Sequence, residues 1–97
     1  MPELTISEKD FRKQVIDLLK TFHWRYYFTW NSIHSPAGFP DIVAARLSRL
    51  IFAELKSDKG KVTPEQQEWL DLLEGTGKVE VFVWRPTDFE KIVEELR

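Results

Sequence analysis

The sequence predicts an α/β domain in which helices pack on the faces of one mixed β-sheet, with the element order α-β-β-β-α-β-α. Three observations lead to this fold class. An amphipathic helical pattern opens the chain, two apolar β-branched runs in its middle indicate a hairpin, and a second helical pattern separates that hairpin from a further strand. A hairpin followed by a helical crossover to another strand gives antiparallel and parallel pairing in one sheet.

Composition limits the classes of protein that this chain can be. Its 97 residues, 42% hydrophobic and 31% charged, suit one globular domain over residues 1–97 rather than a disordered segment. It has no cysteine, which excludes disulfides and thiolate metal sites and fits a reducing compartment. No apolar run is long enough to span a membrane and no secretory signal opens the chain, so we expect a cytoplasmic protein without a membrane partner.

The charge balance bears on nucleic-acid binding. Acidic residues slightly outnumber basic ones, giving a formal net charge of −2. Generic phosphate binding depends on lysine and arginine. The balance therefore argues against a protein that only coats DNA, and less strongly against an enzyme whose acidic residues are covered by a metal ion.

The first helix is expected from about residue 7 to residue 21. Its apolar residues recur at helical spacing: Phe11, Val15, Leu18, Leu19 and Phe22. Either Thr5 or Ser7 can cap it, and Thr5 and Glu8 have the spacing of a capping box. Glu8 also extends the apolar stripe by one turn toward the core. A first-turn glutamate that complements the helix dipole explains Glu8 equally well.

Residues 24–30 are rich in aromatic side chains and indicate a strand, followed by a loop over residues 31–40. Such aromatics can stack on nucleic-acid bases, although a place in the core is the commoner role for strand aromatics. His34 in the loop could contact phosphate or act as a base, but a lone loop histidine is more often solvated.

The two central runs, residues 38–56, contain three charged residues whose burial would be costly unless they are paired or bind a metal. These are Asp41, Glu54 and Lys56. If the hairpin loop is Ser48-Arg49, Asp41 lies opposite Lys56 and Glu54 lies on the diagonal. Any loop of even length puts the three side chains on one face, because side chains alternate along a strand.

Two carboxylates and an ammonium on one face can bind a hard divalent cation and a phosphate. The set fits metal-assisted phosphodiester hydrolysis better than glycoside hydrolysis, which has no use for a lysine in the same cluster. An ordinary alternative is a cross-strand ion pair between Asp41 and Lys56, with Glu54 exposed on an edge strand. The spacing alone leaves both interpretations open.

The second helix begins after a polar loop at residues 57–62. Thr63 is expected to cap it, Pro64 takes the first helical position, and Gln66 stands where a capping box places its second partner. Gln66 also lies on the apolar stripe of this helix and can point toward the sheet. Gly75 and Gly77 are expected to end the helix.

A strand over residues 79–84 and a final helix from Pro86 complete the predicted elements. The strand is almost continuously apolar, which predicts burial on both faces. Thr87 and Glu90 have capping-box spacing at the start of the last helix.

Pro40-Asp41 followed by Glu54-Leu55-Lys56 resembles the signature of PD-(D/E)XK nucleases. The wider pattern, G-F-P-D-I-V, F-A-E-L-K, V-T-P-E-Q-Q-E-W-L and V-F-V-W-R-P, resembles the VRR-NUC branch, especially its small stand-alone phage and bacterial members. The resemblance runs from Glu8 to the final helix and implies a restriction-endonuclease-like sheet flanked by helices.

The resemblance also implies roles for individual residues. Asp41 and Glu54 would bind the metal, with the Leu55 carbonyl as a further ligand, and Lys56 would be the catalytic lysine. Glu8 matches a glutamate that can complete the metal site, and Gln66 matches an active-site glutamine, for which Gln67 is the less suitable candidate. The implied cofactor is Mg²⁺, with Mn²⁺ as a substitute.

The resemblance also implies a DNA substrate. Short members of the family resemble homodimeric enzymes that resolve Holliday junctions or other branched DNA, so we expect a homodimer that acts on branched DNA. A restriction-type or repair nuclease acting on plain duplex is a second enzymatic interpretation. The alternative from another class is a non-catalytic DNA-binding or assembly subunit that retains the nuclease fold. The location expected for a nuclease of this type is the cytoplasm of a bacterial or phage-infected cell.

Overall fold

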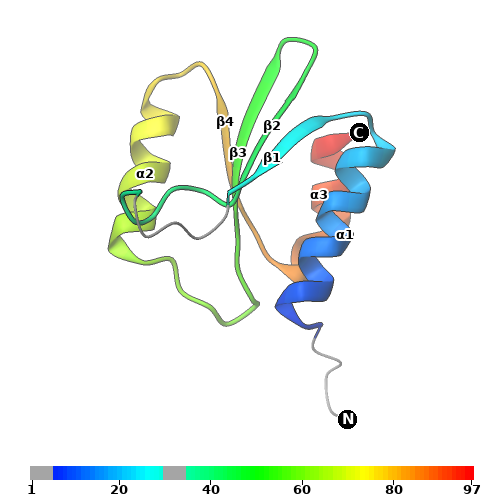
Figure 1. The fold of residues 1–97 in the computed structure, drawn as a ribbon, viewed down its shortest axis with the longest axis horizontal. Coiled ribbons are helices and arrows are strands. Elements are labelled where there is room, and N and C mark those ends of the chain that lie inside the picture. Colours follow the sequence, from blue (N-terminus) through cyan, green and yellow to red (C-terminus); the bar gives the residue numbers. More distant parts are fainter. Residues whose placement is uncertain (1–5, 30–34) are drawn as a thin grey trace.

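The computed structural model describes residues 6–29 and 35–97, and within them the elements follow the predicted order (Figure 1). Trp30 and His34, together with the proposed cap Thr5, lie outside the described residues. The described elements are helix α1 (Glu8–Thr21), strands β1 (Arg25–Phe28), β2 (Ile42–Arg46) and β3 (Arg49–Leu55), helix α2 (Pro64–Gly75), strand β4 (Glu80–Trp84), the 3-10 turn η1 (Pro86–Asp88) and helix α3 (Phe89–Leu96).

The strands form one mixed sheet in the order β1-β2-β3-β4. The first three strands pair antiparallel, whereas β4 runs parallel to β3 because α2 makes the crossover between them. Figure 1 shows α1 and α3 on one side of the sheet and α2 on the other. The predicted fold class, a mixed sheet flanked by helices, is confirmed.

The main core lies between the sheet and the α1/α3 pair. Its buried members come from α1, β2, β3, β4, α3 and the residue that precedes β1: Phe11, Val15, Leu19, Trp24, Ile42, Ala44, Ile51, Ala53, Trp84, Ile92 and Leu96. Tyr26 and Phe28 pack against this cluster, whereas Tyr27 is 63% exposed on the opposite face. A core role is therefore confirmed for most aromatics of the first strand, as alternation along a strand requires.

The hairpin loop is Leu47-Ser48, not Ser48-Arg49 as expected, so the pairing shifts by two residues. Arg46 pairs with Arg49, and Leu47 takes φ 55°, the positive value that type II′ hairpin turns require at their first loop position. Arg49 belongs to β3 because its guanidinium donates two hydrogen bonds of 2.7 Å to Glu80 of β4. The loop keeps an even length, so the face on which each side chain lies is unchanged.

Two local expectations near the end of the chain are wrong. The apolar strand β4 is not buried on both faces: four of its five residues are only partly buried, because β4 is an edge strand. Thr87 does not cap the last helix. Instead the Asp88 carboxylate accepts a hydrogen bond of 3.0 Å from the Arg85 backbone N–H, and Thr87 N–H donates to Asp58.

Helix α2 is attached to the second face of the sheet through the loop that leads into β2. The Phe39 ring meets Trp69 of α2 and Phe52 of β3 edge-on, with ring centroids 5.0 and 5.9 Å apart. Gly38, with φ 97°, lies directly against the first turn of α2. A Cβ at this position would be 2.6 Å from the carbonyl carbon of Glu65, so the close approach requires glycine.

None of the helices in the described ranges is long and apolar enough to cross a membrane.

Gly38→Ala is expected to lower the free energy of unfolding by at least about 2 kcal/mol, because it adds backbone strain and a clash with the backbone of α2. Chemical denaturation monitored by tryptophan fluorescence measures the change. Gly75→Ala is the matched control, since a Cβ at Gly75 meets no atom within 4 Å. Equal stability of the Gly38→Ala and Gly75→Ala proteins would contradict the proposed contact.

Candidate active site

Asp41 and Glu54 come together because they stand next to each other in the β2–β3 register. Ile42 pairs with Ala53, so the same register continued by one residue sets Asp41 beside Glu54 rather than beside Lys56. The Asp41 carboxylate accepts a hydrogen bond of 2.9 Å from Leu55 N–H, and its backbone carbonyl accepts one of 2.8 Å from Thr29 N–H. Asp41 is therefore fixed from both neighbouring strands.

Glu54 is the one charged residue of the described chain that is buried, with 3% of its surface exposed. Its Oε1 accepts a hydrogen bond of 3.3 Å from Gln66 Nε2, and its Oε2 is buried without a hydrogen-bond partner among the described residues. Burial first, and then the neighbouring Asp41 carboxylate, raise the pKa of Glu54 from 4.5 to about 8, although nearby Lys56 opposes the shift. Without a cation the site therefore favours a protonated Glu54 at neutral pH.

Gln66 makes the capping-box contacts that its sequence position predicted, and its side chain also points toward the sheet, as its place on the apolar stripe allowed. Its Oε1 accepts a hydrogen bond of 2.9 Å from Thr63 N–H, and Thr63 Oγ1 accepts from Gln66 N–H, which completes the capping box of α2. Its Nε2 points the other way, to Glu54. The cap thus fixes the side chain that holds the buried carboxylate. Gln67 instead donates to Asp71 on its own helix.

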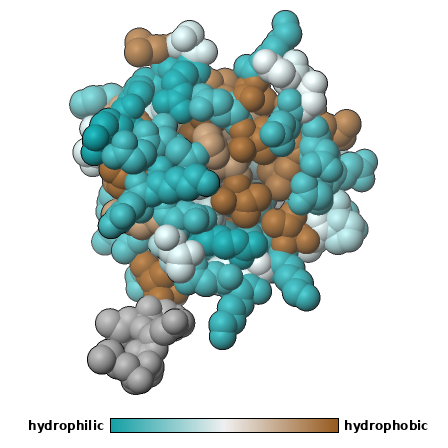
Figure 2. Space-filling model, turned by 180° about the vertical axis from the view of Figure 1, so that it is seen from behind, coloured by the Kyte–Doolittle hydropathy of each residue, from teal (hydrophilic) through white to brown (hydrophobic). Residues whose placement is uncertain are grey.

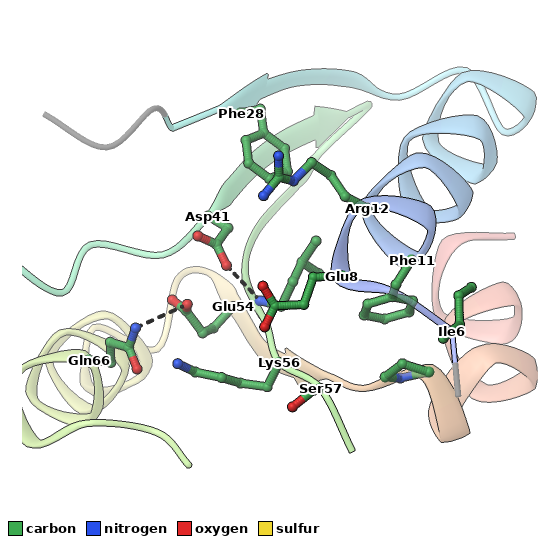
Figure 3. A pocket seen from close by; sticks show the side chains of 12 residues that line it. Ile6, Glu8, Phe11, Arg12, Phe28, Asp41, Glu54, Lys56, Ser57 and Gln66 are labelled. Carbon is green, nitrogen blue, oxygen red and sulfur yellow. Dashed lines mark hydrogen bonds between the residues drawn. The ribbon is translucent and has the colours of Figure 1, made fainter. Parts of the chain in front are cut away.

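The predicted site residues line one cavity of about 260 Å³. Its walls include all six of them: Glu8, Asp41, Glu54, Leu55, Lys56 and Gln66. Figure 3 shows the side chains of Glu8 and Lys56 reaching toward the two carboxylates from α1 and from the end of β3. Glu8 opens α1, which is capped by Ser7 through a hydrogen bond of 3.1 Å from Asp10 N–H.

The structure does not favour the ordinary ion-pair interpretation. Residues 6–29 and 35–97 contain two ion pairs, Arg49–Glu80 and Arg97–Glu94, and neither involves Asp41 or Lys56. Glu54 is also not exposed on an edge, since β3 lies inside the sheet.

A hard divalent cation fits the donor set. Asp41 and Glu54 offer carboxylate oxygens, and the buried Oε2 of Glu54 lacks the partner that a cation would supply. The described part of the chain holds no group of three or more acidic, histidine or cysteine side chains arranged for a metal. Mg²⁺ binds through one or two carboxylates and keeps several waters, which matches the pair of Asp41 and Glu54 in this cavity.

Two further residues of the same cavity, to which the sequence assigned no role at the site, lie beside the carboxylates. These are Arg12 of α1 and Phe28 of β1, and the Arg12 guanidinium lies 4.8 Å from the centre of the Phe28 ring. Helical spacing could have found Arg12, because it follows Glu8 by four residues and shares its helix face.

Raising the pH should destabilise the metal-free protein through Glu54. Between pH 4.5 and about 8 the folded state keeps a proton on Glu54 that the unfolded state has lost. The stabilisation of the folded state by protonated Glu54 is thus complete below pH 4.5 and is lost as the pH rises through about 8. Glu54→Gln should flatten the pH dependence of the unfolding free energy, measured by denaturation with a chelator present. Glu68→Gln, an exposed change on α2, should retain it, and identical profiles for wild type and Glu54→Gln would contradict the assignment.

Comparisons with known proteins agree with this geometry. The model of the VRR-NUC domain family matches residues 4–86. No curated protein sequence matches the chain significantly. Among solved structures, a VRR_NUC domain protein superposes with a TM-score of 0.71 at 16% identity, over 96% of this chain and 87% of that one. Hjc of Archaeoglobus fulgidus, a Holliday junction resolvase, superposes with a TM-score of 0.60 at 19% identity, over 80% of this chain and 69% of that one.

At such low identity the two structures establish the fold alone. The family match covers most of the chain and includes every predicted site residue. The chain therefore belongs to the VRR-NUC domain family.

Proposed function

We propose that this protein is a Mg²⁺-dependent endonuclease that hydrolyses phosphodiester bonds in DNA. The observation that supports this most directly is the pair of carboxylates Asp41 and Glu54, one of which has a buried, unpartnered oxygen, with Lys56 lining the same cavity. A buried carboxylate oxygen without a partner is costly, and a bound cation would remove that cost. The family match is independent support for a nuclease.

Each site residue has a role that follows from its position. Asp41, Glu54 and the Leu55 carbonyl would bind the cation directly, and Glu8, which lines the same cavity, would complete the metal site through a coordinated water. Mn²⁺ is a suitable substitute for Mg²⁺. When bound, the cation lowers the pKa of a coordinated water and stabilises negative charge on the phosphate. Lys56 would orient that water or balance the charge that develops as the water oxygen attacks phosphorus and the P–O bond to the leaving sugar oxygen breaks.

Gln66 would act as a positioning residue. Its amide holds Glu54 Oε1, which leaves Oε2 free to face the cation. Because the other end of its side chain belongs to the capping box of α2, the amide is fixed before any ligand binds.

The substrate that we propose is branched DNA, cut by a homodimer in the bacterial or phage-infected cytoplasm. One chain offers one site, whereas symmetric cutting of a junction needs two, and a two-fold dimer is the commonest way to supply them. Figure 2 shows apolar side chains gathered near the middle of one face with hydrophilic ones around them, as interfaces between subunits often have. The fold likeness to a Holliday junction resolvase is compatible with this substrate.

With Mg²⁺ the purified protein should nick plasmid or cut a four-way junction, and chelation should abolish this. Asp41→Ala and Lys56→Ala should each lower the cleavage rate at least about a hundredfold, since each removes a group that acts on the charged transition state. Gel assays measure the rates, and circular dichroism checks the fold. If Asp41→Ala cuts as fast as wild type, the site assignment is wrong.

Comparison of junction, flap and linear duplex substrates would separate a junction enzyme from a nuclease acting on plain duplex. Equal rates on all three would overturn the preference for branched DNA, and light scattering that shows a monomer under the same conditions would overturn the dimer. DNA binding without metal binding or cleavage would instead indicate a non-catalytic subunit.

Gln66→Ala should lower the cleavage rate about 10- to 100-fold and raise the Mg²⁺ concentration needed for half-maximal activity, as expected for loss of a residue that orients a metal ligand. Thr63→Ala separates capping from positioning. It should cost about 1 kcal/mol of stability and leave the Mg²⁺ requirement unchanged. Gln67→Ala is the matched neighbour and should behave as wild type. Equal Mg²⁺ requirements for Gln66→Ala and Thr63→Ala would contradict the positioning role.

A further inference from the structure

Arg12 is placed differently from the other arginines whose side-chain contacts the structure describes. The guanidinium of Arg46 donates to three backbone carbonyls, that of Arg49 pairs with Glu80, and that of Arg85 donates to two loop carbonyls. Among the described residues, Arg12 makes no side-chain hydrogen bond and no ion pair. Its planar donor group is therefore available to a ligand.

The Arg12 side chain is nevertheless held in place. Its guanidinium lies 4.8 Å from the centre of the Phe28 ring, a distance at which a cation and an aromatic face attract each other. Phe28 itself packs against the main core and pairs with Ile42 through its backbone. A rigid ring beneath a guanidinium reduces the entropy lost when that guanidinium binds an anion.

The position of Arg12 relative to the carboxylates is also defined. Arg12 lines the catalytic cavity and also a larger open cleft of about 990 Å³, which contains Asp41, Glu54 and Gln66 and continues past Phe28 and Thr29 to the exposed Tyr27. In Figure 3, Arg12 and Lys56 lie on opposite sides of the two carboxylates. A chain of phosphates that passes Lys56 and the carboxylates thus meets Arg12 next along the cleft.

We infer that Arg12 binds the backbone phosphate adjacent to the scissile one, on the β1 side of the site, and that Phe28 holds it ready to do so. The inference rests on the proposed function. It extends that function by assigning a second phosphate subsite outside the cation-binding group. The chemistry fits, because the forked guanidinium can donate two hydrogen bonds to one phosphate.

The overall charge gives this contact particular weight. The chain has a formal net charge of −2, so its surface as a whole does not attract DNA. Cations inside the cleft must therefore attract the DNA at the place where it binds. A cation on each side of the carboxylates also fixes the path of the DNA strand through the cleft.

The test measures binding of the four-way junction and uses Lys56→Ala as the parent protein, so that cleavage does not interfere. Adding Arg12→Ala should weaken binding about tenfold, as expected for one charge-assisted contact of roughly 1.4 kcal/mol. It should also reduce the slope of log affinity against log salt by about 0.9. Lys13→Ala, an exposed change that removes a cation next to Arg12 but outside both cavities, should change affinity less than twofold.

One further variant and one modified DNA substrate separate a phosphate contact from a general loss of positive charge. Phe28→Leu should weaken binding when Arg12 is present and have no effect once Arg12→Ala has been made. A single uncharged methylphosphonate next to the cut should weaken binding by the parent protein on one side of the cut only, and should not affect the Arg12→Ala protein.

The outcomes test the Arg12 inference and the proposed role of Lys56 independently. If Arg12→Ala binds within twofold of its parent with an unchanged salt slope, the inference is overturned, and it is equally overturned if the methylphosphonate weakens both proteins alike. If Lys56→Ala still cuts the junction, the role proposed for Lys56 fails. The junction affinities with and without Arg12→Ala can then be compared in the Asp41→Ala protein instead.

Discussion

The pairing of β2 with β3 is the constraint on which the site depends. It sets Asp41 beside Glu54, and the hydrogen bond from Leu55 N–H to the Asp41 carboxylate fixes their separation. A shift of the register by one residue would move one carboxylate to the core face, where the packed side chains of α1 and α3 leave no room for it. At the hairpin end Arg46 pairs with Arg49, and the side chain of Arg49 is bound to Glu80 of β4, which keeps Arg49 in strand β3.

The site depends next on how closely α2 approaches the sheet. Gly38 lets the loop before β2 touch the backbone of the first turn of α2, and Phe39 packs against Trp69 of the same helix. These contacts place Gln66 within hydrogen-bond distance of Glu54. One polar side chain thereby serves both the stability of a helix end and the geometry of a carboxylate, which explains why a complete structural role for Gln66 does not exclude a functional one.

The electrostatics of the site differ from those expected for a structural ion cluster. Glu54 is buried beside another carboxylate, and its second oxygen has no partner among the described residues, so folding retains an unfavourable arrangement. Natural proteins keep such arrangements mainly at functional sites. Arg12 and Lys56 line the same cavity without forming ion pairs with these carboxylates, which leaves both cations able to bind an anionic ligand.

The sequence by itself determined the order of the elements and the faces of the hairpin, and its resemblance to a family supplied the full set of residues around the site. Helical and strand periodicities are local properties, and the parity of an even hairpin loop does not depend on its position, so Asp41, Glu54 and Lys56 could be assigned to one face even with the wrong loop. The cap of α2 was likewise readable from local spacing, and its hydrogen bond is present. The candidate role of Gln66 came from the family resemblance, whereas its contact with Glu54 is a finding of the structure.

Only the tertiary structure decided the register, the edge position of β4 and the place of Arg12. The loop is Leu47-Ser48 rather than Ser48-Arg49, because the side chain of Arg49 binds Glu80 of β4 and Arg49 lies in β3. That contact joins residues far apart in the chain. The four-residue spacing between Glu8 and Arg12 could have drawn attention to Arg12. That its guanidinium lies on Phe28 beside the carboxylates depends on how α1 packs on the sheet, which no local pattern specifies.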